Sequence, residues 1–229
     1  TLQMTFVVNN SPFAGKEGKY LTSRKVEERL RSELETDVSL RVENTDSPDV
    51  WIVSGRGELH LSILIENMRR EGYELQVSKP EVIVKEIDGV RCEPVERVQI
   101  AVPEEYTGAV MESLGERKGE MQNMTNSGNN QVRLEFMVPA RGLIGYSTEF
   151  LTQTRGYGIM NHSFDSYRPM AEGQVGGRRQ GVMVSMENGK TSQYGMMQVE
   201  DRGILFVEPG TEIYAGMIVG EHTRENDIT

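Results

Sequence analysis

The spacing of apolar residues divides the start of the chain into six expected elements. Leu2 to Val8 is typical of a strand, and Val26, Leu30 and Leu34 recur every four residues, as on the buried side of a helix. The remaining expected elements are strands near 40–42 and 50–53, a helix from about 58 to 70, and a strand from residue 73. This β-α-β-β-α-β order predicts a ferredoxin-like sandwich, an antiparallel sheet with two helices on one face, over residues 1–90.

The same order of elements returns roughly 80 residues further along the chain. Val98, Ile100 and Val102 alternate on a strand, and Pro103-Glu104-Glu105 opens a helix that ends near Gly119. The further expected elements are a weak strand near 121, a strand over 132–138, a helix that includes 143–151, and a closing strand near 164. We expect a second ferredoxin-like sandwich over residues 91–170, joined to the first by a short linker at about Ile87 to Pro94.

The pattern changes after residue 170, where the helical spacing is lost. Short apolar runs between glycine-rich turns predict strands over 182–186, 194–199, 204–207 and 213–219. A segment of strands alone, residues 171–229, is typical of part of a barrel or sandwich. The whole chain is therefore expected to be α+β, with two ferredoxin-like βαββαβ sandwiches followed by a partial all-β domain.

Composition excludes several classes of protein. The 229 residues include a single cysteine, Cys92, which excludes disulfide scaffolds and zinc ribbons. No apolar run approaches the roughly 20 residues that cross a bilayer, and the first residues lack the basic start of a signal peptide. We expect a cytoplasmic protein with no membrane partner. Because the chain opens on Thr1 and ends within an expected strand, we also expect it to be a fragment.

Net charge limits how the chain could bind nucleic acid. The formal net charge is −10, whereas a protein that binds nucleic acid through its overall field is strongly positive. We therefore expect no DNA partner, and RNA contacts only through local basic clusters. The best cluster is Arg178-Arg179 after Gly176-Gly177, because glycines allow close approach and arginine binds phosphate through two hydrogen bonds. A solvated charged loop is the alternative interpretation of this pair.

Two further clusters have both a structural and an RNA-binding interpretation. Arg117-Lys118 ends an expected helix, where cations suit the negative end of the helix dipole, and the same pair could grip phosphate. Arg155-Gly156-Tyr157-Gly158 matches the first half of an RNA-recognition motif, but Ile159-Met160-Asn161-His162 does not match its second half. A helix end followed by a glycine turn is the favoured interpretation of this second segment.

Motifs for catalysis are mostly absent. Gly189-Lys190-Thr191 is similar to the end of a phosphate-binding loop, but Val184 stands where the earlier glycine is required, which favours a polar hairpin turn. His60, His162 and His222 lie far apart, and none has a metal-ligand spacing with another His or Cys. We expect no catalytic, cofactor or metal site in this chain.

Several segments resemble the translational GTPases related to elongation factor G. Ser54-Gly55-Arg56-Gly57-Glu58-Leu59-His60-Leu61 resembles a signature of domain III, and Val138-Pro139 through Gly145-Tyr146, with Thr154-Arg155-Gly156, resembles domain V. Both domains are ferredoxin-like in that family. Elongation factor G has a large domain IV between these two domains, and the linker between them in this chain is too short to contain it. Residues 11–19, 115–119, 139–145 and 198–203 resemble the BipA (TypA) subfamily.

The resemblance implies a function for the parent protein. It would be a ribosome-associated GTPase acting in stress adaptation, virulence in some bacteria, translation regulation and assembly of the large ribosomal subunit. GTP and Mg²⁺ would bind an absent N-terminal domain, and the partners would be the bacterial 70S or 50S ribosome, through 23S rRNA and ribosomal proteins. The candidate RNA or ribosome contacts are Arg178, Arg179, Arg117, Lys118, Arg141, Lys190 and Arg202, and the candidates for an interdomain relay are Arg56, Glu58 and His60.

Two other functions stay open at this point. Paired ferredoxin-like units also form regulatory modules that bind small molecules, and these would have an apolar pocket between the units. A free-standing enzyme that uses His60 or His162 would have a cleft with perturbed ionisable groups.

Overall fold

The chain folds into two compact units. The computed structural model describes residues 1–175 and 180–229, and the units are Thr1–Gly176 and Gly177–Thr229. No helix within these described ranges is both long and apolar enough to cross a membrane.

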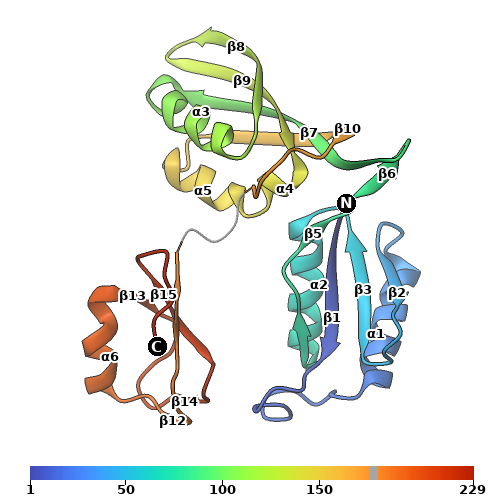
Figure 1. Ribbon diagram of the computed structural model, residues 1–229, viewed down its shortest axis with the longest axis vertical. Coiled ribbons are helices and arrows are strands. Elements are labelled where there is room, and N and C mark those ends of the chain that lie inside the picture. The colour runs from blue at the N-terminus through green and yellow to red at the C-terminus, as the bar shows by residue number, and fades with distance from the viewer. Residues whose placement is uncertain (176–179) are drawn as a thin grey trace. The chain divides into compact units, whose positions relative to one another are not determined.

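The first half of the larger unit is an α/β sandwich with the predicted order of elements (Figure 1). The elements are β1 (Leu2–Val8), α1 (Ser23–Thr36), β2 (Arg41–Asn44), β3 (Val50–Gly55), α2 (Glu58–Glu71) and β4 (Leu75–Val77). The strands lie in the order β2-β3-β1-β4 and pair antiparallel, and β5 (Glu81–Val82) pairs with the start of β1. This topology confirms the first ferredoxin-like sandwich.

The core of this first sandwich follows from the apolar spacing. The side chains of Phe6 and Trp51 on the sheet pack with Leu30 of α1 and with Leu61 and Met68 of α2, all of them buried. α1 begins where the Thr22 hydroxyl accepts a hydrogen bond from the Lys25 backbone N–H (3.4 Å). α2 ends at Gly72, whose left-handed φ of 98° suits glycine.

The second half of the larger unit repeats this plan. Its elements are β7 (Val90–Pro103), the 3₁₀ helix η1 (Glu104–Tyr106), α3 (Thr107–Glu116), β8 (Glu120–Gly128), β9 (Gln131–Pro139), α4 (Ala140–Leu143), α5 (Tyr146–Gln153) and β10 (Ile159–Pro169). The strand order β10-β7-β9-β8 is the same as in the first sandwich, and it confirms the second one. Its core is formed by Val98, Leu134 and Phe136 on the sheet against Leu114 and Phe150 on the helices.

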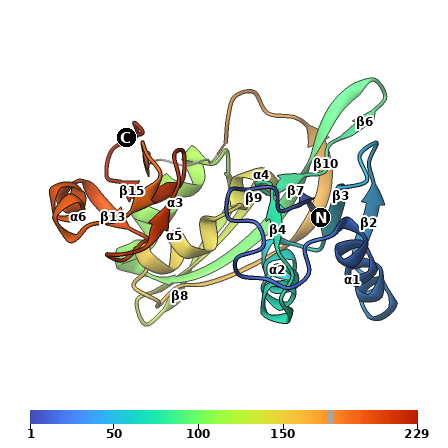
Figure 2. The same cartoon turned by 90° about the horizontal axis from the view of Figure 1, so that it is seen from below.

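Two local expectations about the second sandwich are wrong. The expected linker at 87–94 is a hairpin, in which β6 (Lys85–Ile87) pairs with the start of β7 (Figure 2). Asp88 and Gly89 both have positive φ, so the chain turns back tightly between the two strands. The expected single helix over 143–151 is two helices, because Ile144 is extended and Gly145 is left-handed.

The smaller unit contains short strands, as expected, and one helix that was not. Its elements are β11 (Val182–Val184), β12 (Gly189–Lys190), α6 (Gln193–Val199), the 3₁₀ helix η2 (Glu200–Arg202), β13 (Gly203–Leu205), β14 (Glu212–Ile213) and β15 (Ile218–His222). The strands form one sheet of order β11-β15-β13 and one β12–β14 pair. The expected strand at 194–199 is wrong, since Ser192 caps a helix there by accepting a hydrogen bond from the Gly195 N–H (3.1 Å).

Candidate functional site

The turn from β3 into α2 places Arg56, Glu58 and His60 side by side. Gly55 ends β3 in a crowded position, where a Cβ would lie 2.8 Å from His60 Nδ1 and 2.9 Å from Leu61 Cδ2 unless these side chains shifted. Glu58 is the first residue of α2, where a carboxylate suits the positive end of the helix dipole. The predicted relay residues therefore form one local group.

His60 ties the start of α2 to the end of α1. Its Nδ1 accepts a hydrogen bond from the Arg56 backbone N–H (3.0 Å), and its Nε2 is hydrogen-bonded to the carboxylate of Asp37, the C-cap of α1. Because Nδ1 accepts, the ring proton is on Nε2 and is donated to Asp37. This hydrogen bond lowers the pKa of Asp37, which is also lowered by the backbone N–H of Ser39.

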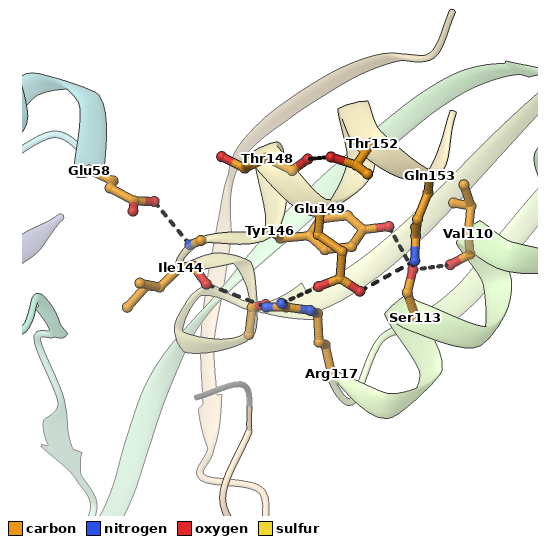
Figure 3. Close-up of polar contacts among 12 residues, drawn as sticks. Glu58, Val110, Ser113, Arg117, Ile144, Tyr146, Thr148, Glu149, Thr152 and Gln153 are labelled. Atoms are coloured by element: carbon orange, nitrogen blue, oxygen red, sulfur yellow. Dashed lines mark hydrogen bonds and ion pairs between the residues drawn. The ribbon is translucent and has the colours of Figure 1, made fainter. Parts of the chain in front are cut away.

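Glu58 reaches from the first sandwich to the second. Its Oε2 accepts a hydrogen bond from the Gly145 backbone N–H (3.1 Å), in the break between α4 and α5 (Figure 3). The neighbouring Ile144 side chain packs against the core of the first sandwich. The α4–α5 break, residues 144–145, is therefore the point at which the second sandwich holds the first.

Arg117, the C-cap of α3, holds the α4–α5 break in place. One guanidinium nitrogen, Nη1, donates to the carbonyl oxygens of Gly142 (2.6 Å) and Ile144 (3.4 Å), and Nη2 bonds Glu149 (2.6 Å) (Figure 3). The group also lies over the Tyr146 ring, 4.9 Å from its centroid. Only 9% of the Arg117 side chain is exposed, and these contacts are with carbonyl oxygens and a carboxylate outside α3.

Tyr146 joins the same network on the helix side of the second sandwich. Its hydroxyl is hydrogen-bonded to the Ser113 hydroxyl (2.9 Å), and Ser113 in turn donates to Gln153 (3.1 Å). Burial raises the pKa of Tyr146, so the phenol is neutral at physiological pH. This buried network holds α3 against α5 and keeps Arg117 in place.

A cleft of about 740 Å³ lies between the two sandwiches next to this contact. Leu59 and Ile63 of α2 form part of one wall, and Leu143 and Met160 form part of the other. His60 and His162 also line it. The hydrogen bond of His162 Nδ1 to Glu96 Oε2 (3.2 Å) raises the pKa of His162.

The structure also shows the surroundings of the other candidates that fall within its described residues. Lys118 is exposed at the end of α3, with a left-handed φ of 62°. Arg141 forms an ion pair with the buried Glu93 and donates to the carbonyls of Ala171 and Gly173, so it clamps the chain that leaves β10. Arg178 and Arg179 lie outside the described residues.

Two candidates belong to the smaller unit. Lys190 is exposed on β12, and Arg202 is exposed at the end of η2, where its carbonyl accepts hydrogen bonds from Thr223. Arg202 lines a polar pocket of about 430 Å³ together with His222 and Arg224. Asp201 also lines this pocket, so its walls have both positive and negative charges.

Sequence reasoning missed Asp37, Gly145 and Glu149. Each lies far along the chain from its partner, by 23, 87 and 32 residues respectively. One signal was available for Gly145, since two glycines stand within four residues inside an expected helix. In the parts of the chain that the structure describes, no three His, Cys, Asp or Glu side chains are grouped as metal ligands.

Comparison with known proteins identifies these domains. The profile of elongation factor G domain III matches residues 19–79, that of the elongation factor G C-terminus matches 90–176, and that of the TypA/BipA C-terminal domain matches 180–229. A large ribosomal subunit assembly factor BipA from Bacillus subtilis is 79% identical over 228 residues, which is all of this chain and 37% of that protein. The chain belongs to the BipA family.

Other BipA relatives match in the same way. The proteins of that name from Synechocystis and Escherichia coli K12 are 58% and 51% identical, again over all of this chain and over 38% of their own length. The chain thus spans less than two fifths of the BipA relatives that it matches, and it matches their C-terminal part.

Proposed function

We propose that this chain is the docking part of a BipA-type factor that acts on the ribosome in assembly of the large subunit. GTP hydrolysis, with its Mg²⁺, takes place on a domain outside this chain, in the cytoplasm. The observation that supports this most strongly is 79% identity, over the whole chain, to a protein named a large ribosomal subunit assembly factor. In this proposal residues 1–90, 91–170 and 171–229 act as three consecutive modules.

Binding to ribosomal particles tests this proposal directly. The chain is expected to sediment with purified 50S or 70S particles, and its affinity should fall as salt rises, because phosphate contacts release counterions. The same preparation should not hydrolyse GTP above background. Absence of sedimentation with either particle would contradict the docking role, and GTP hydrolysis by this chain would contradict the division of labour.

A paired substitution addresses the arginine cluster. Changing Arg178 and Arg179 to Glu should weaken binding to the particles and reduce its salt dependence. Changing Arg24 and Lys25 of α1 to Glu makes the same change of charge at another exposed site and should have little effect. Equal effects of the two pairs would show that Arg178 and Arg179 form no specific contact.

The relay function of Arg56, Glu58 and His60 is part of the same proposal. What supports it is the hydrogen bond from Gly145 N–H to Glu58, which joins this group to the second sandwich. Glu58→Ala should speed hydrogen exchange at the Gly145 amide, whereas Glu66→Ala on the same helix should not, since the ion pairs of Glu66 within the described residues are with Arg69 and Arg70. Unchanged exchange at Gly145 would contradict the relay.

The cleft between the sandwiches supports a second candidate, a small-molecule regulatory module. Its volume of about 740 Å³ and its partly apolar walls are within the range of ligand sites. A panel of nucleotides and amino acids should then raise the melting temperature of the chain, as ligands that bind only the folded state do. No shift with any of them, together with binding to ribosomal particles, would favour the docking function alone.

A further inference from the structure

The second sandwich leaves one face of its sheet without helices. α3 and α5 lie on the opposite face of the sheet (Figure 1), and the buried residues of β7 and β9 pack in the core with those of the two helices. Strand register places the outward residues of all four strands in rows across this face. One row is Ile159, Ala101, Arg133 and Thr125, and the next is Asn161, Gln99, Glu135 and Asn123.

A shallow groove of about 590 Å³ runs over these rows. Its lining includes five neutral side chains that can form hydrogen bonds, Gln99, Asn123, Thr125, Ser127 and Asn161. Among the described residues, none of the five side chains has a hydrogen-bond partner. All five are exposed, so their donors and acceptors face solvent.

Some residues of the same types are used differently elsewhere in the chain. Asn9 bonds Glu74, Asn44 bonds Arg31, and Asn188 accepts from the Ala215 N–H, so each amide helps to hold the fold. The amides of the groove contribute nothing of this kind. Because they stand in register on adjacent strands, they form a preorganised set of donors and acceptors on a rigid surface.

The charges of the groove also favour a particular ligand. Arg133 is exposed and has no carboxylate partner in the described chain, whereas the anion beside it, Glu135, forms an ion pair with Arg97. The groove therefore has an unpaired cation on a chain of net charge −10. At the groove's end, Ile159 follows Arg155-Gly156-Tyr157-Gly158, in which the Tyr157 side chain is 69% exposed.

We propose that this groove binds an unpaired segment of RNA. Amide and hydroxyl side chains contact base edges and ribose hydroxyls, which are accessible in single strands, and Arg133 contacts a phosphate. A protein partner fits less well, because the core of a protein interface is rich in apolar and aromatic residues, whereas seven of the eleven residues that line this groove are polar or charged and none is aromatic. The proposal deepens the docking function above, on which it rests, by naming the RNA class and the surface.

The test measures binding of the chain to fluorescent 12-nucleotide RNAs of oligo(U), oligo(A) and mixed unstructured sequence, by anisotropy at several salt concentrations. Gln99→Ala combined with Asn161→Ala should weaken binding about tenfold or more through lost base contacts. Arg133→Gln should reduce the slope of log affinity against log salt by about 0.7, as expected for one phosphate contact on a single strand.

The first sandwich supplies matched controls on its own open face. Gln3 and Arg41 both stand opposite Ser54 in the strand register, and Arg41 is exposed, like Arg133. Gln3→Ala and Arg41→Gln should leave RNA affinity and its salt slope unchanged. Thermal melting of every variant should match that of the unchanged chain, because these side chains are exposed, or half-buried in the case of Gln3, and form no hydrogen bond or ion pair in the described chain.

The other possible outcomes each contradict either the groove assignment or the docking function. Equal affinity of the groove variants and the controls would overturn the groove assignment, as would equal affinity for DNA of the same sequences. If the groove variants lose binding to 50S particles while no RNA binds the chain, the groove holds a protein instead. If RNA binds in the groove but the chain does not sediment with ribosomal particles, the docking function is wrong and the groove is still an RNA-binding site.

Discussion

The two sandwiches share one topology but differ in the helix that follows their third strand, and this difference affects the contact between them. In the first, the second helix is continuous over 14 residues, Glu58–Glu71. In the second, the corresponding region is divided into α4 and α5 by the extended Ile144 and the left-handed Gly145. The division turns Ile144 out of its own sandwich and against the core of the other. A broken helix is thus used here as an attachment point.

The sandwiches differ also in how they use polar side chains. The helices of the first are covered by ion pairs, such as Arg29 with Glu33 and Glu71, and Arg69 and Arg70 with Glu66. The open face of the second has polar side chains that bond nothing in the described chain. Surface ion pairs contribute little stability, so this contrast concerns binding more than folding.

The largest effect is expected from removing the group that holds the broken helix. Arg117→Ala removes the guanidinium that bonds two carbonyl oxygens and the Glu149 carboxylate in a largely buried site. Loss of one member of a buried pair costs about 3 kcal/mol, and urea unfolding should show a decrease of that size. Lys118→Ala, one residue away and exposed, is the matched control. Similar unfolding midpoints for both variants would contradict the role given to Arg117.

Glu74 has a comparable role in the first sandwich, where it organises the long loop between β1 and α1. The carboxylate accepts hydrogen bonds from the backbone N–H groups of Gly15, Glu17 and Gly18 and from the Asn9 amide. These bonds lower the pKa of Glu74 to about 2, led by those from Gly15 and Gly18. The second sandwich replaces this loop with the three residues of η1 and needs no such group.

A pH series tests this difference between the loops. Glu74→Gln should cost about 2 kcal/mol at pH 7, because a neutral amide accepts these hydrogen bonds less strongly and cannot satisfy them all. Since the folded pKa lies below the unfolded one, the stabilisation is complete above about pH 4.5 and is lost as the pH falls toward 2. A stability difference between the two proteins that stays constant from pH 6 to pH 3 would show that the carboxylate charge is not responsible.

The contact between the sandwiches should respond to a smaller change. Ile144→Ala removes a partly buried side chain from the first core and should cost roughly 1–2 kcal/mol, less than a fully buried residue. It should also let the two sandwiches unfold independently, so that amide hydrogen exchange becomes faster in one sandwich than in the other. Leu143→Ala is the control, because Leu143 packs against its own sandwich. If Leu143→Ala separates the sandwiches and Ile144→Ala does not, the attachment is misplaced.

Local periodicity predicted both sandwiches because burial within each one repeats along the chain. Val26 and Leu30, or Val98 and Ile100, pack against elements of the same sandwich, so their spacing reports the fold. Periodicity could not predict the broken helix, since Leu143, Tyr146 and Phe150 fit one continuous helical face. Ile144 breaks that face for a partner in the other sandwich, and no local spacing encodes that partner.

The predicted site residues show the same limit. Arg56, Glu58 and His60 lie together because they are close in the sequence, and the turn into α2 was correctly expected. The pattern could not distinguish Arg117, which is buried beside Glu149, from its exposed neighbour Lys118. Both cations end the same helix, and only the tertiary position of Glu149 separates them.

The smallest effect has the opposite sign and separates folding from binding at Lys118. Its φ of 62° is left-handed, a region where residues with a Cβ are strained. Lys118→Gly relieves this strain but also gives the unfolded chain more conformational freedom, so the net gain in stability should be about 0.5 kcal/mol. Lys118→Ala keeps the strain and should leave stability unchanged. If Lys118 contacts ribosomal RNA, both variants should weaken binding to 50S particles equally, because both remove the same charge. A gain in stability with unchanged binding would instead make Lys118 only the residue that ends α3.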